Sequence, residues 1–465
     1  MSSLSLKNIT SIVFLAILLP ACDQQDGSQS IVENASAPDQ PLVWVPGWQN
    51  GPLMHTPRSG AASVKISGVI HVIGGVDGKD FQRSSEYIRI ADDGSLSAWR
   101  LGPELNTERG FFAAVRSDKY LYVVGGGQGA YGKDLLNSVE RAAILPDGTI
   151  DNWTVEKYTL NTKRRCAKLA ILGKHIYAFG GFSGILLDTV ERAEILPDGS
   201  LGEWEVMMDN MNLARYIHGV KKVANRVYMV GGHDKEKGAG ITAVEWSRED
   251  SEGWLEPWQI SKPLQTGRYG LATVQHGDFL YALGGLGGAA YLESVEKARI
   301  NSDGSLSGWT FTTPLPSRRE GANALVVKNN IYFIGGTNLT GYKSSIEYGS
   351  FNEDGDIGYW AKPAEAKEQK ARLALQQAKN RVLPNEAVIV SHEQTEHYSY
   401  LMVKRDDGLF AWLAAPVSDV SADARIRFPN GVVMRGFYSK ELKREFPAIM
   451  FVGEVQKVRA LQVVN

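Results

Sequence analysis

Short apolar runs that end in a pair of glycines recur along most of the chain. The run before Gly74, "VIHVI", and the run before Gly284, "LYAL", are apolar at nearly every position. A strand that does not alternate between apolar and polar residues must be covered on both faces. The runs therefore predict strands inside sheets that pack face to face. The glycine pairs begin at Gly74, Gly125, Gly180, Gly231, Gly284 and Gly335.

Three further landmarks recur around each glycine pair. An arginine stands sixteen residues before it: Arg58, Arg109, Arg164, Arg215, Arg268 and Arg319. A glutamate in a strand-like context follows it: Glu86, Glu140, Glu191, Glu245, Glu296 and Glu347. A turn such as "PDGS" then leads to a tryptophan: Trp99, Trp153, Trp204, Trp258, Trp309 and Trp360. Landmarks in one order, repeated six times, predict six copies of one supersecondary unit.

One unit alone cannot bury both faces of its apolar strand, so the units must stack and close into a ring. The repeat resembles the kelch repeat over residues 42–360, which implies a six-bladed β-propeller with four-stranded antiparallel blades. The tryptophans are expected to fill the outer gaps between blades. Trp48 is a seventh such tryptophan for six blades. We therefore expect residues 42–53 to close the ring as a fourth strand of blade six.

The repeated charges have two interpretations. Arginine forks suit carboxylates, and in one class of kelch proteins pocket arginines at this position take acidic peptides. Here each arginine is matched by one glutamate, which favours a structural Arg–Glu pair, or an arginine that caps carbonyl groups near the channel. Ligands without sixfold symmetry are recognised by residues that differ between blades.

Those differences lie directly after the arginines and in the loops after the glycine pairs. The candidate ligand-binding residues at this mouth of the propeller are Arg165, Tyr216, Tyr269, Glu320, Tyr131, His233, Tyr291 and Tyr342. They could bind a sugar or a peptide segment, or the loop aromatics could merely cover the channel. No Ser-His-Asp order, phosphate-binding loop or convincing metal-ligand spacing is present, so no catalytic residue, metal or cofactor is expected. His218 occupies a position that is apolar in the other units, which favours a core histidine.

The first 22 residues predict export. An apolar stretch from Ile12 to Leu19 is too short to span a bilayer, and Leu19-Pro20-Ala21-Cys22 resembles a bacterial lipoprotein signal. The resemblance implies lipidation of Cys22, with residues 23–41 as a flexible tether and a periplasm-facing location in the bacterial cell envelope. The other cysteine, Cys166, heads an apolar strand, which favours a buried inert thiol.

The C-terminal part predicts a helical linker over residues 361–383 and a small β domain over residues 384–465. "YSYLMVKRDDGLFAWLAAP" and "VVMRGFYSKELKREFPAIMFVGEV" resemble an OB-like domain of exported bacterial proteins, the group around NrfJ. The expected fold class is thus all-β: a six-bladed propeller of four-stranded kelch blades plus a small OB-like barrel.

The sequence favours a membrane-tethered binding or scaffolding module that is monomeric and takes a cell-envelope protein or glycan at the mouth. A formal charge of −2 gives no reason to expect a nucleic-acid partner. The alternative is an enzyme on carbohydrates, such as the sugar mutarotase known among kelch folds, with a pocket around Glu320 and Arg165. An inward-facing carboxylate with a raised pKa would favour that alternative. In a third possibility the C-terminal domain carries the activity.

Overall fold

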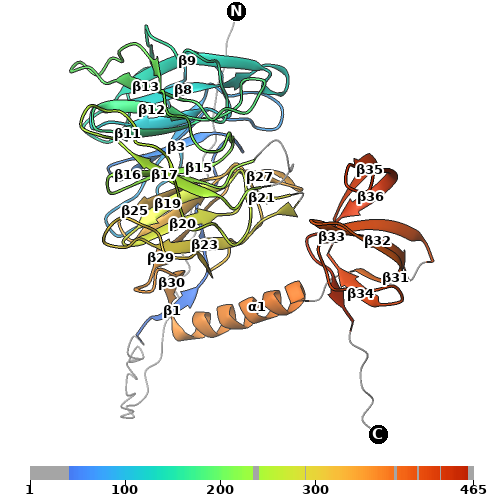
Figure 1. Cartoon of the computed structure of the whole chain (residues 1–465). Helices are drawn as coiled ribbons and strands as arrows, with labels where there is room; N and C mark the ends of the chain where they lie inside the picture. Colours follow the sequence, from blue (N-terminus) through green and yellow to red (C-terminus); the bar gives the residue numbers. More distant parts are fainter. Residues whose placement is uncertain are drawn as a thin grey trace, which may run out of the picture. The chain divides into compact units, whose positions relative to one another are not determined.

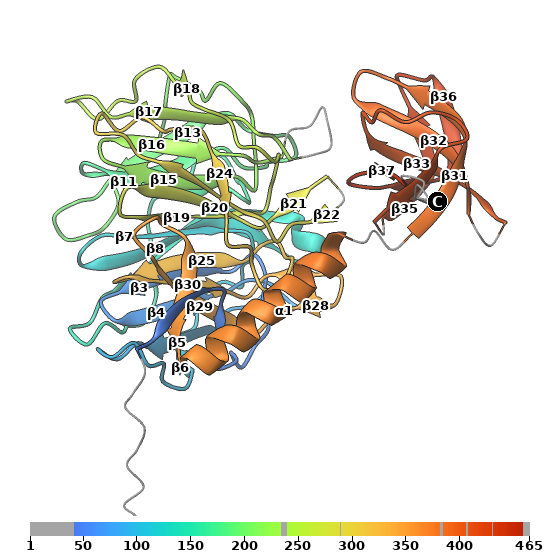
Figure 2. The same cartoon turned by 90° about the horizontal axis from the view of Figure 1, so that it is seen from below.

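The propeller consists of six blades arranged around a central axis (Figures 1 and 2). The computed structural model describes residues 41–233, 240–288, 290–381, 385–405, 408–429 and 431–458. Blades are numbered here in chain order from Arg58. The first strands of successive blades lie side by side, and that of blade 6 meets that of blade 1, which closes the ring.

The blades are antiparallel sheets with the expected strand order. Blade 1 has β3 (Ala62–Ile66), β4 (Val69–Ile73), β5 (Ser85–Arg89) and β6 (Arg100–Gly102). Blade 2 has β7 (Ala113–Arg116), β8 (Tyr120–Gln128), β9 (Asp134–Ala143) and β10 (Thr154–Val155). Blade 3 has β11 (Lys168–Leu172), β12 (His175–Phe179), β13 (Val190–Glu194) and β14 (Glu205–Val206).

Blades 4 to 6 follow the same plan. Blade 4 has β15 (Gly219–Val223), β16 (Arg226–Val230), β17 (Val244–Arg248) and β18 (Gln259–Ile260). Blade 5 has β19 (Ala272–His276), β20 (Phe279–Leu283), β23 (Val295–Arg299) and β24 (Thr310–Thr312). Blade 6 has β25 (Asn323–Val327), β26 (Asn330–Ile334) and β29 (Ile346–Phe351), and β30 (Ile357–Ala361) pairs with the end of β29. The loops carry the hairpins β21–β22 (Leu286–Gly287, Ala290–Tyr291) and β27–β28 (Thr337–Asn338, Gly341–Tyr342), and the 3₁₀ turn η1 (Ala130–Gly132).

The hydrophobic core lies between the blades rather than inside any one of them. Val64 and Ile73 of blade 1 pack with Leu121 and Val123 of blade 2 in one cluster, and equivalent clusters fill the other five gaps. Every residue of β4 and of β12 is buried. The prediction that the apolar runs are covered on both faces is confirmed.

In blades 2 to 5, a tyrosine on the second strand joins the blade to the next one at the end away from the loops. The hydroxyl of Tyr122 donates to the carbonyl of Gly199 (2.7 Å) and that of Tyr281 to the carbonyl of Gly355 (2.8 Å). In blade 1 a histidine replaces the tyrosine, and Nε2 of His71 lies 2.9 Å from the carbonyl oxygen of the corresponding turn glycine. The glycine turns between third and fourth strands therefore also supply hydrogen-bond acceptors between blades.

Both ends of the propeller sequence contribute to blade 6. The N-terminal strand β2 (Gln49–Asn50) pairs with β29, as expected from residues 42–53. β1 (Val43–Pro46) pairs with β30, which continues from β29. Nε1 of Trp48 donates to the carbonyl of Pro314, whereas Trp360 is 59% exposed. The expectation that Trp360 fills a gap between blades is therefore wrong, because Trp48 occupies the equivalent position.

One helix and one further sheet follow the propeller. α1 (Pro363–Arg381) begins against the propeller, where Ala366 packs with Val45 and Ala361. The C-terminal sheet contains β31 (Asn385–Gln394), β32 (Tyr398–Arg405), β33 (Phe410–Pro416), β34 (Arg425–Phe428), β35 (Val432–Ser439), β36 (Arg444–Phe451) and β37 (Gln456–Lys457). Its order is β35-β36-β33-β32-β31-β34-β37, with β33 and β36 parallel. Within the described ranges, no helix has the length and apolar character to cross a bilayer.

The two tryptophans give a matched test of ring closure. We expect Trp48→Ala to lower the free energy of unfolding by about 3 kcal/mol, because the change removes a large packed side chain and a hydrogen bond at the closing blade. The exposed Trp360→Ala should change it by less than about 0.5 kcal/mol. Urea unfolding followed by fluorescence measures both, and equal effects would contradict the assigned closure.

Candidate functional site at the propeller mouth

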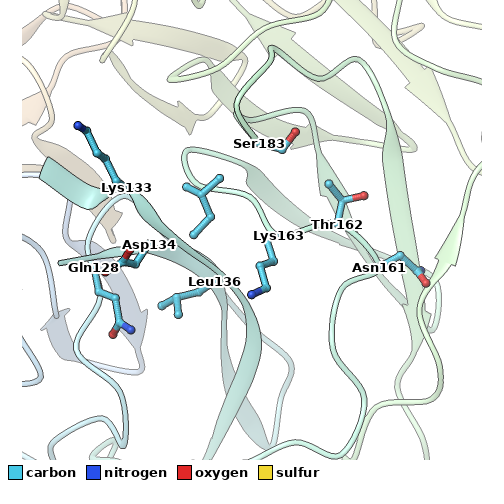
Figure 3. A pocket seen from close by; sticks show the side chains of 9 residues that line it. Gln128, Lys133, Asp134, Leu136, Asn161, Thr162, Lys163 and Ser183 are labelled. Carbon is cyan, nitrogen blue, oxygen red and sulfur yellow. The ribbon is translucent and has the colours of Figure 1, made fainter. Parts of the chain in front are cut away.

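A hollow of about 680 Å³ opens between the loops of blades 2 and 3 (Figure 3). Gln128, Lys133, Asp134, Leu136, Asn161, Thr162, Lys163 and Ser183 are among its lining residues. None of the residues predicted to bind a ligand lines it. Asn161 is held in place, because its backbone N–H donates to the buried Glu191. Arg165 lies near it, because Nη1 of Arg165 donates to the carbonyl of Gly132, the residue before Lys133.

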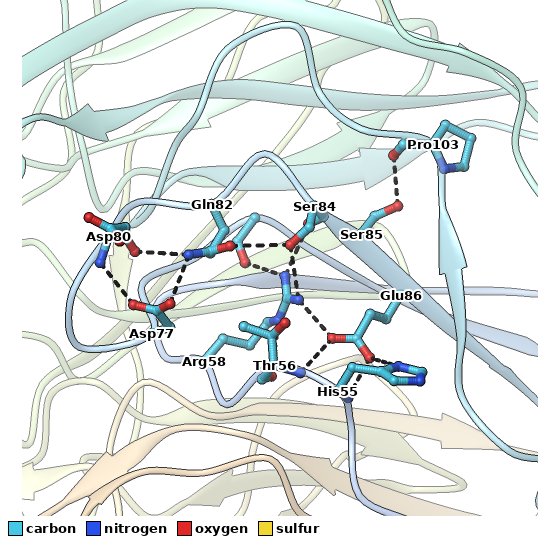
Figure 4. A network of polar contacts seen from close by, with 11 residues as sticks. His55, Thr56, Arg58, Asp77, Asp80, Gln82, Ser84, Ser85, Glu86 and Pro103 are labelled. Atoms are coloured by element: carbon cyan, nitrogen blue, oxygen red, sulfur yellow. Dashed lines mark hydrogen bonds and ion pairs between the residues drawn. The ribbon is translucent and has the colours of Figure 1, made fainter.

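Each repeated arginine uses both of its terminal nitrogens, Nη1 and Nη2, within its own blade, as Figure 4 shows for Arg58. In blade 1, Nη1 of Arg58 donates to the carbonyls of Gly74 (2.9 Å) and Ser84 (3.0 Å), and Nη2 donates to the Glu86 carboxylate (2.8 Å). Glu86 also accepts from the backbone N–H groups of His55 and Thr56. Burial opposes ionisation of Glu86, but these donors hold its pKa below the ordinary value.

The same ion pair occurs in all six blades, with Nη2 to carboxylate distances of 2.5 to 2.8 Å. The side chains of the pairs in blades 1 to 5 have no exposed surface, and those in blade 6 have 2% and 6%. The arginines therefore do both things that the sequence suggested, pairing with glutamate and capping carbonyls. They present no open fork to a ligand.

The residue after each arginine forms an isolated β-bridge with the residue that follows the glycine pair. The bridges join Ser59 to Val76, Gly110 to Gly127, Arg165 to Phe182, Tyr216 to His233, Tyr269 to Leu286 and Glu320 to Thr337. The positions that vary between blades therefore lie beside the variable loops. The structure brings both sets of predicted residues to the same end of the propeller.

The second residue after each arginine has left-handed backbone geometry in every blade. The φ angles are 59° at Gly60, 56° at Phe111, 58° at Cys166, 52° at Ile217, 65° at Gly270 and 61° at Gly321. Five of the six successive pairs are joined by a backbone hydrogen bond, for example from the Gly321 N–H to the Gly270 carbonyl (2.9 Å). These residues form an inner ring that links neighbouring blades. Sequence analysis missed it, although the fixed distance from the arginine marks it.

Glycine in the inner ring makes room for Glu320. A Cβ atom on Gly270 would lie 2.7 Å from Oε2 of Glu320, so the carboxylate of blade 6 lies over the ring residue of blade 5. Burial raises the pKa of Glu320 to about 7. This is the kind of carboxylate that the enzymatic alternative requires, but within the described residues no second titratable side chain forms a hydrogen bond with it.

Aromatic side chains form a belt on the blade 3 to blade 5 side of the mouth. Ring centroids of Phe182 and Tyr216 are 5.9 Å apart, those of Tyr216 and His233 5.2 Å, and those of His233 and Tyr269 4.9 Å. The Arg165 guanidinium lies 5.3 Å from the centroid of the Phe182 ring. This belt brings Arg165, Tyr216, His233 and Tyr269 together, as the sequence predicts for a ligand site.

The remaining candidates lie around this belt. Nη1 of Arg165 donates to the backbone carbonyl of Tyr131, whose own side chain is 87% exposed. The Tyr291 hydroxyl is within electrostatic reach of Glu320, which raises the pKa of Tyr291 after the larger effect of burial. Tyr342 lies over Gly78 at the neighbouring blade. Tyr131 is therefore free to contact a partner but takes no part in the belt.

Similarity to known proteins identifies the repeat. Kelch-like protein 28 of Homo sapiens is 30% identical over 169 residues, which cover 35% of this chain and 26% of that protein. Alpha-scruin of Limulus polyphemus is 30% identical over 131 residues, or 28% of this chain and 14% of that protein. The matches thus span about a quarter or less of these relatives. The solved structure of YjhT covers 66% of this chain and 98% of its own, with a TM-score of 0.52 and 15% identity. No family model matches the chain.

The propeller is a kelch-repeat propeller. Its buried histidine and cysteine have the inert surroundings expected from sequence. His218 is fully buried, and burial lowers its pKa well below the ordinary value. Burial also raises the pKa of Cys166 to about 11. In the part of the chain that the structure describes, no group of three His, Cys, Asp or Glu side chains could hold a metal ion.

The buried ion pairs give a prediction about the stability of the kelch propeller. Nη2 of Arg215 lies 2.8 Å from Glu245, and both side chains are fully buried. We expect Arg215→Met to lower the free energy of unfolding by about 3 to 5 kcal/mol, because it leaves a buried carboxylate unpaired.

Two control variants distinguish loss of charge from loss of packing. The double variant Arg215→Met, Glu245→Gln should recover part of the loss, since no charge remains unpaired. Lys174→Met removes a cation from the exposed pair with Glu194 and should change the free energy by less than about 1 kcal/mol. Chemical denaturation of all three variants measures these effects, and an Arg215 effect no larger than that of Lys174 would contradict the prediction.

Proposed function

We propose that this chain is a protein-binding module that recognises its partner at the kelch propeller mouth. The observation that carries the proposal is the separation of constant and variable residues. The six arginines and six glutamates are consumed by internal contacts, whereas the charged and aromatic residues that differ between blades gather at one end. In one class of kelch proteins, a peptide binds at this position of the fold.

The mouth carries a positive charge on one side and a negative charge on the opposite side. Arg165 belongs to blade 3 and Glu320 to blade 6, which lie opposite each other in a ring of six. Tyr216 and Tyr269 line the side between them, and Ser59 and Gly110 occupy the equivalent positions on the other side. An extended peptide with oppositely charged side chains fits such a surface. Aromatic side chains add large contact areas at little cost in conformational entropy.

A lone carboxylate supports binding better than catalysis. A glycosidase-type reaction needs a second carboxyl group, and an epimerase needs an acid and a base placed on the same substrate. Burial alone accounts for the raised pKa of Glu320, so no second carboxyl group among the described residues acts on it. The ligand-binding interpretation explains Glu320, Arg165 and the aromatic belt together.

We also propose that the module is displayed from a membrane by a lipid on Cys22, facing the bacterial periplasm. Cys22 and the tether over residues 23–41 lie outside the described residues, apart from Pro41. The support is the apolar segment followed by Leu19-Pro20-Ala21-Cys22. The C-terminal sheet is proposed to be an OB-like domain, because five of its strands follow the order β31-β32-β33-β36-β35 with one parallel pair.

Site-specific photocrosslinking tests recognition at the mouth. We expect a photoreactive amino acid at Tyr131, which is 87% exposed, to form an adduct with the partner in cells. The same probe at Met208, which is 91% exposed near the outer strand β14, should not form this adduct. The adduct at Tyr131 should fall at least fivefold in an Arg165→Ala, Tyr216→Ala background. Adducts that are identical at both probes, or unaffected by these substitutions, would refute the proposal.

Lipid attachment is tested by metabolic labelling with a fatty-acid analogue in a bacterial host. We expect Cys22→Ser to abolish labelling and to release the protein from the membrane fraction. Cys166→Ser is the matched control, because it removes the other cysteine, and it should be labelled like the natural chain. Persistent labelling of the Cys22→Ser protein would contradict the anchor.

A further inference from the structure

Glu320 is the one acidic residue among the six that directly follow the repeated arginines. The corresponding residues of the other blades are Ser59, Gly110, Arg165, Tyr216 and Tyr269. The twelve repeated charges are paired, but burial is the sole cause of the raised pKa of Glu320, and no cation opposes it. In the described part of the chain, no side chain forms an ion pair or hydrogen bond with its carboxylate. The propeller therefore holds a half-enclosed acid without its counter-charge.

The groups that face this acid come from blades 3, 4 and 5. Burial raises the pKa of Tyr216, Tyr269 and Tyr291, and the Glu320 charge raises each of them further, so these three hydroxyls lie within its electrostatic reach. It also raises the pKa of Cys166, whereas Arg165 lowers it. His233 lies between Tyr216 and Tyr269 in the aromatic belt. Tyrosines and a buried thiol are neutral near pH 7, so they leave the carboxylate charge unbalanced.

The inner ring shows that space has been left for this acid. Gly270 lies directly under the carboxylate, where any Cβ atom would collide with Oε2. Gly270 and Gly321 are ring residues with left-handed φ angles, but Phe111, Cys166 and Ile217 adopt the same geometry with side chains. Glycine is therefore not demanded by the backbone alone at position 270. It also makes room for the carboxylate at the floor of the mouth.

A carboxylate beside aromatic rings suits a cation. The acid supplies an ion pair, and tyrosine faces attract ammonium and guanidinium groups through their quadrupole. We propose that Glu320 binds an ammonium or guanidinium group of the ligand beside the aromatic belt of Tyr216, His233 and Tyr269. The inference rests on the proposed function of the mouth and adds the chemistry of what it selects. A lysine or arginine side chain of a protein and a free small amine share this chemistry.

Binding should follow the ionisation of Glu320. With a pKa of about 7, roughly one tenth of the carboxylate is ionised at pH 6 and nine tenths at pH 8. A ligand that needs the ionised form therefore binds about tenfold more tightly at pH 8 than at pH 6. Lysine and arginine keep their charge over this range. His233 belongs to the same belt and histidines in general change charge near this range, so a variant must separate the two groups.

Calorimetric titration of the full-length chain with defined probes tests the inference. The probes are Nα-acetyl-lysine amide, Nα-acetyl-arginine amide, a lysine-containing hexapeptide, butylamine and the uncharged Nα-acetyl-norleucine amide. The lysine and arginine probes should bind about tenfold more tightly at pH 8 than at pH 6, and the norleucine probe should not bind. Tighter binding of the hexapeptide than of butylamine identifies a protein segment as the source of the cation, whereas the reverse identifies a small amine.

Glu320→Gln is the decisive variant and Glu104→Gln is its control. Glu104 is an exposed acid 3.9 Å from Arg83, so its loss removes the same charge elsewhere. Glu320→Gln should weaken binding of the lysine probe at pH 8 at least tenfold and abolish the pH dependence, and Glu104→Gln should leave both unchanged. Unchanged affinity in Glu320→Gln, or an unchanged pH dependence, would overturn the inference.

Folding and the broader function are checked separately. The folded-state pKa of Glu320 is raised above the ordinary value, so stability falls as pH rises through about 7. Glu320→Gln should therefore melt no lower than the natural chain at pH 8, which excludes unfolding as the cause of lost binding. The two proposals can fail separately. If the crosslinked adduct at Tyr131 still requires Arg165 and Tyr216 but Glu320→Gln does not weaken binding of the lysine probe, the mouth binds its partner without using Glu320 to hold a cation, and only the inference fails.

Discussion

The buried arginine–glutamate pair is the interaction on which the propeller depends. Each blade turns sharply at its glycine pair, and in blade 1 the N–H of the first glycine, Gly74, donates to the carbonyl of Ser84, the residue before the third strand. Nη1 of Arg58 then donates to the carbonyls of both residues. The glutamate neutralises the arginine and accepts N–H groups from the segment that enters the blade, as Glu86 does from His55 and Thr56. One ion pair thus fixes the turn, the third strand and the link between blades.

This arrangement explains why the most conspicuous charges of the sequence are not its binding site. A buried ion pair is tolerated only when nearly all of its donors and acceptors are used, and such a pair has little left for a ligand. In all six blades Nη1 and Nη2 of the arginine are used in this way, and the buried donors left over are the Nε atoms of Arg109, Arg164, Arg215 and Arg268. The residue after each arginine is the one available to contact a ligand. It forms a β-bridge with the variable loop and takes no part in the arginine–glutamate network. The blade architecture does not fix the residue type at this position, so it can be charged, as it is in Arg165 and Glu320.

Much of the fold could be predicted because its causes are local. Continuous apolar runs must be covered on both faces. A sequence repeat in which each unit has one arginine and one glutamate at constant positions is compatible with few architectures. The N-terminal closure followed from counting tryptophans, although counting alone could not tell that Trp360 would be exposed. The gathering of Tyr216, Tyr269 and Glu320 also followed from their shared position in the repeat. The surroundings of Glu320 could not be predicted, because they depend on Gly270, which belongs to another blade.

The inner ring shows how a symmetric scaffold acquires a site without symmetry. All six ring residues have left-handed geometry, which costs an ordinary residue about 1 to 3 kcal/mol and a β-branched residue such as Ile217 more than glycine. Blades 2 to 4 accept that cost at Phe111, Cys166 and Ile217, and blades 5, 6 and 1 have glycine. The glycine half leaves space that Glu320 and the Phe111 ring occupy. Closure of the ring holds the strained half in place, so the position of the carboxylate is determined by the whole ring rather than by blade 6 alone.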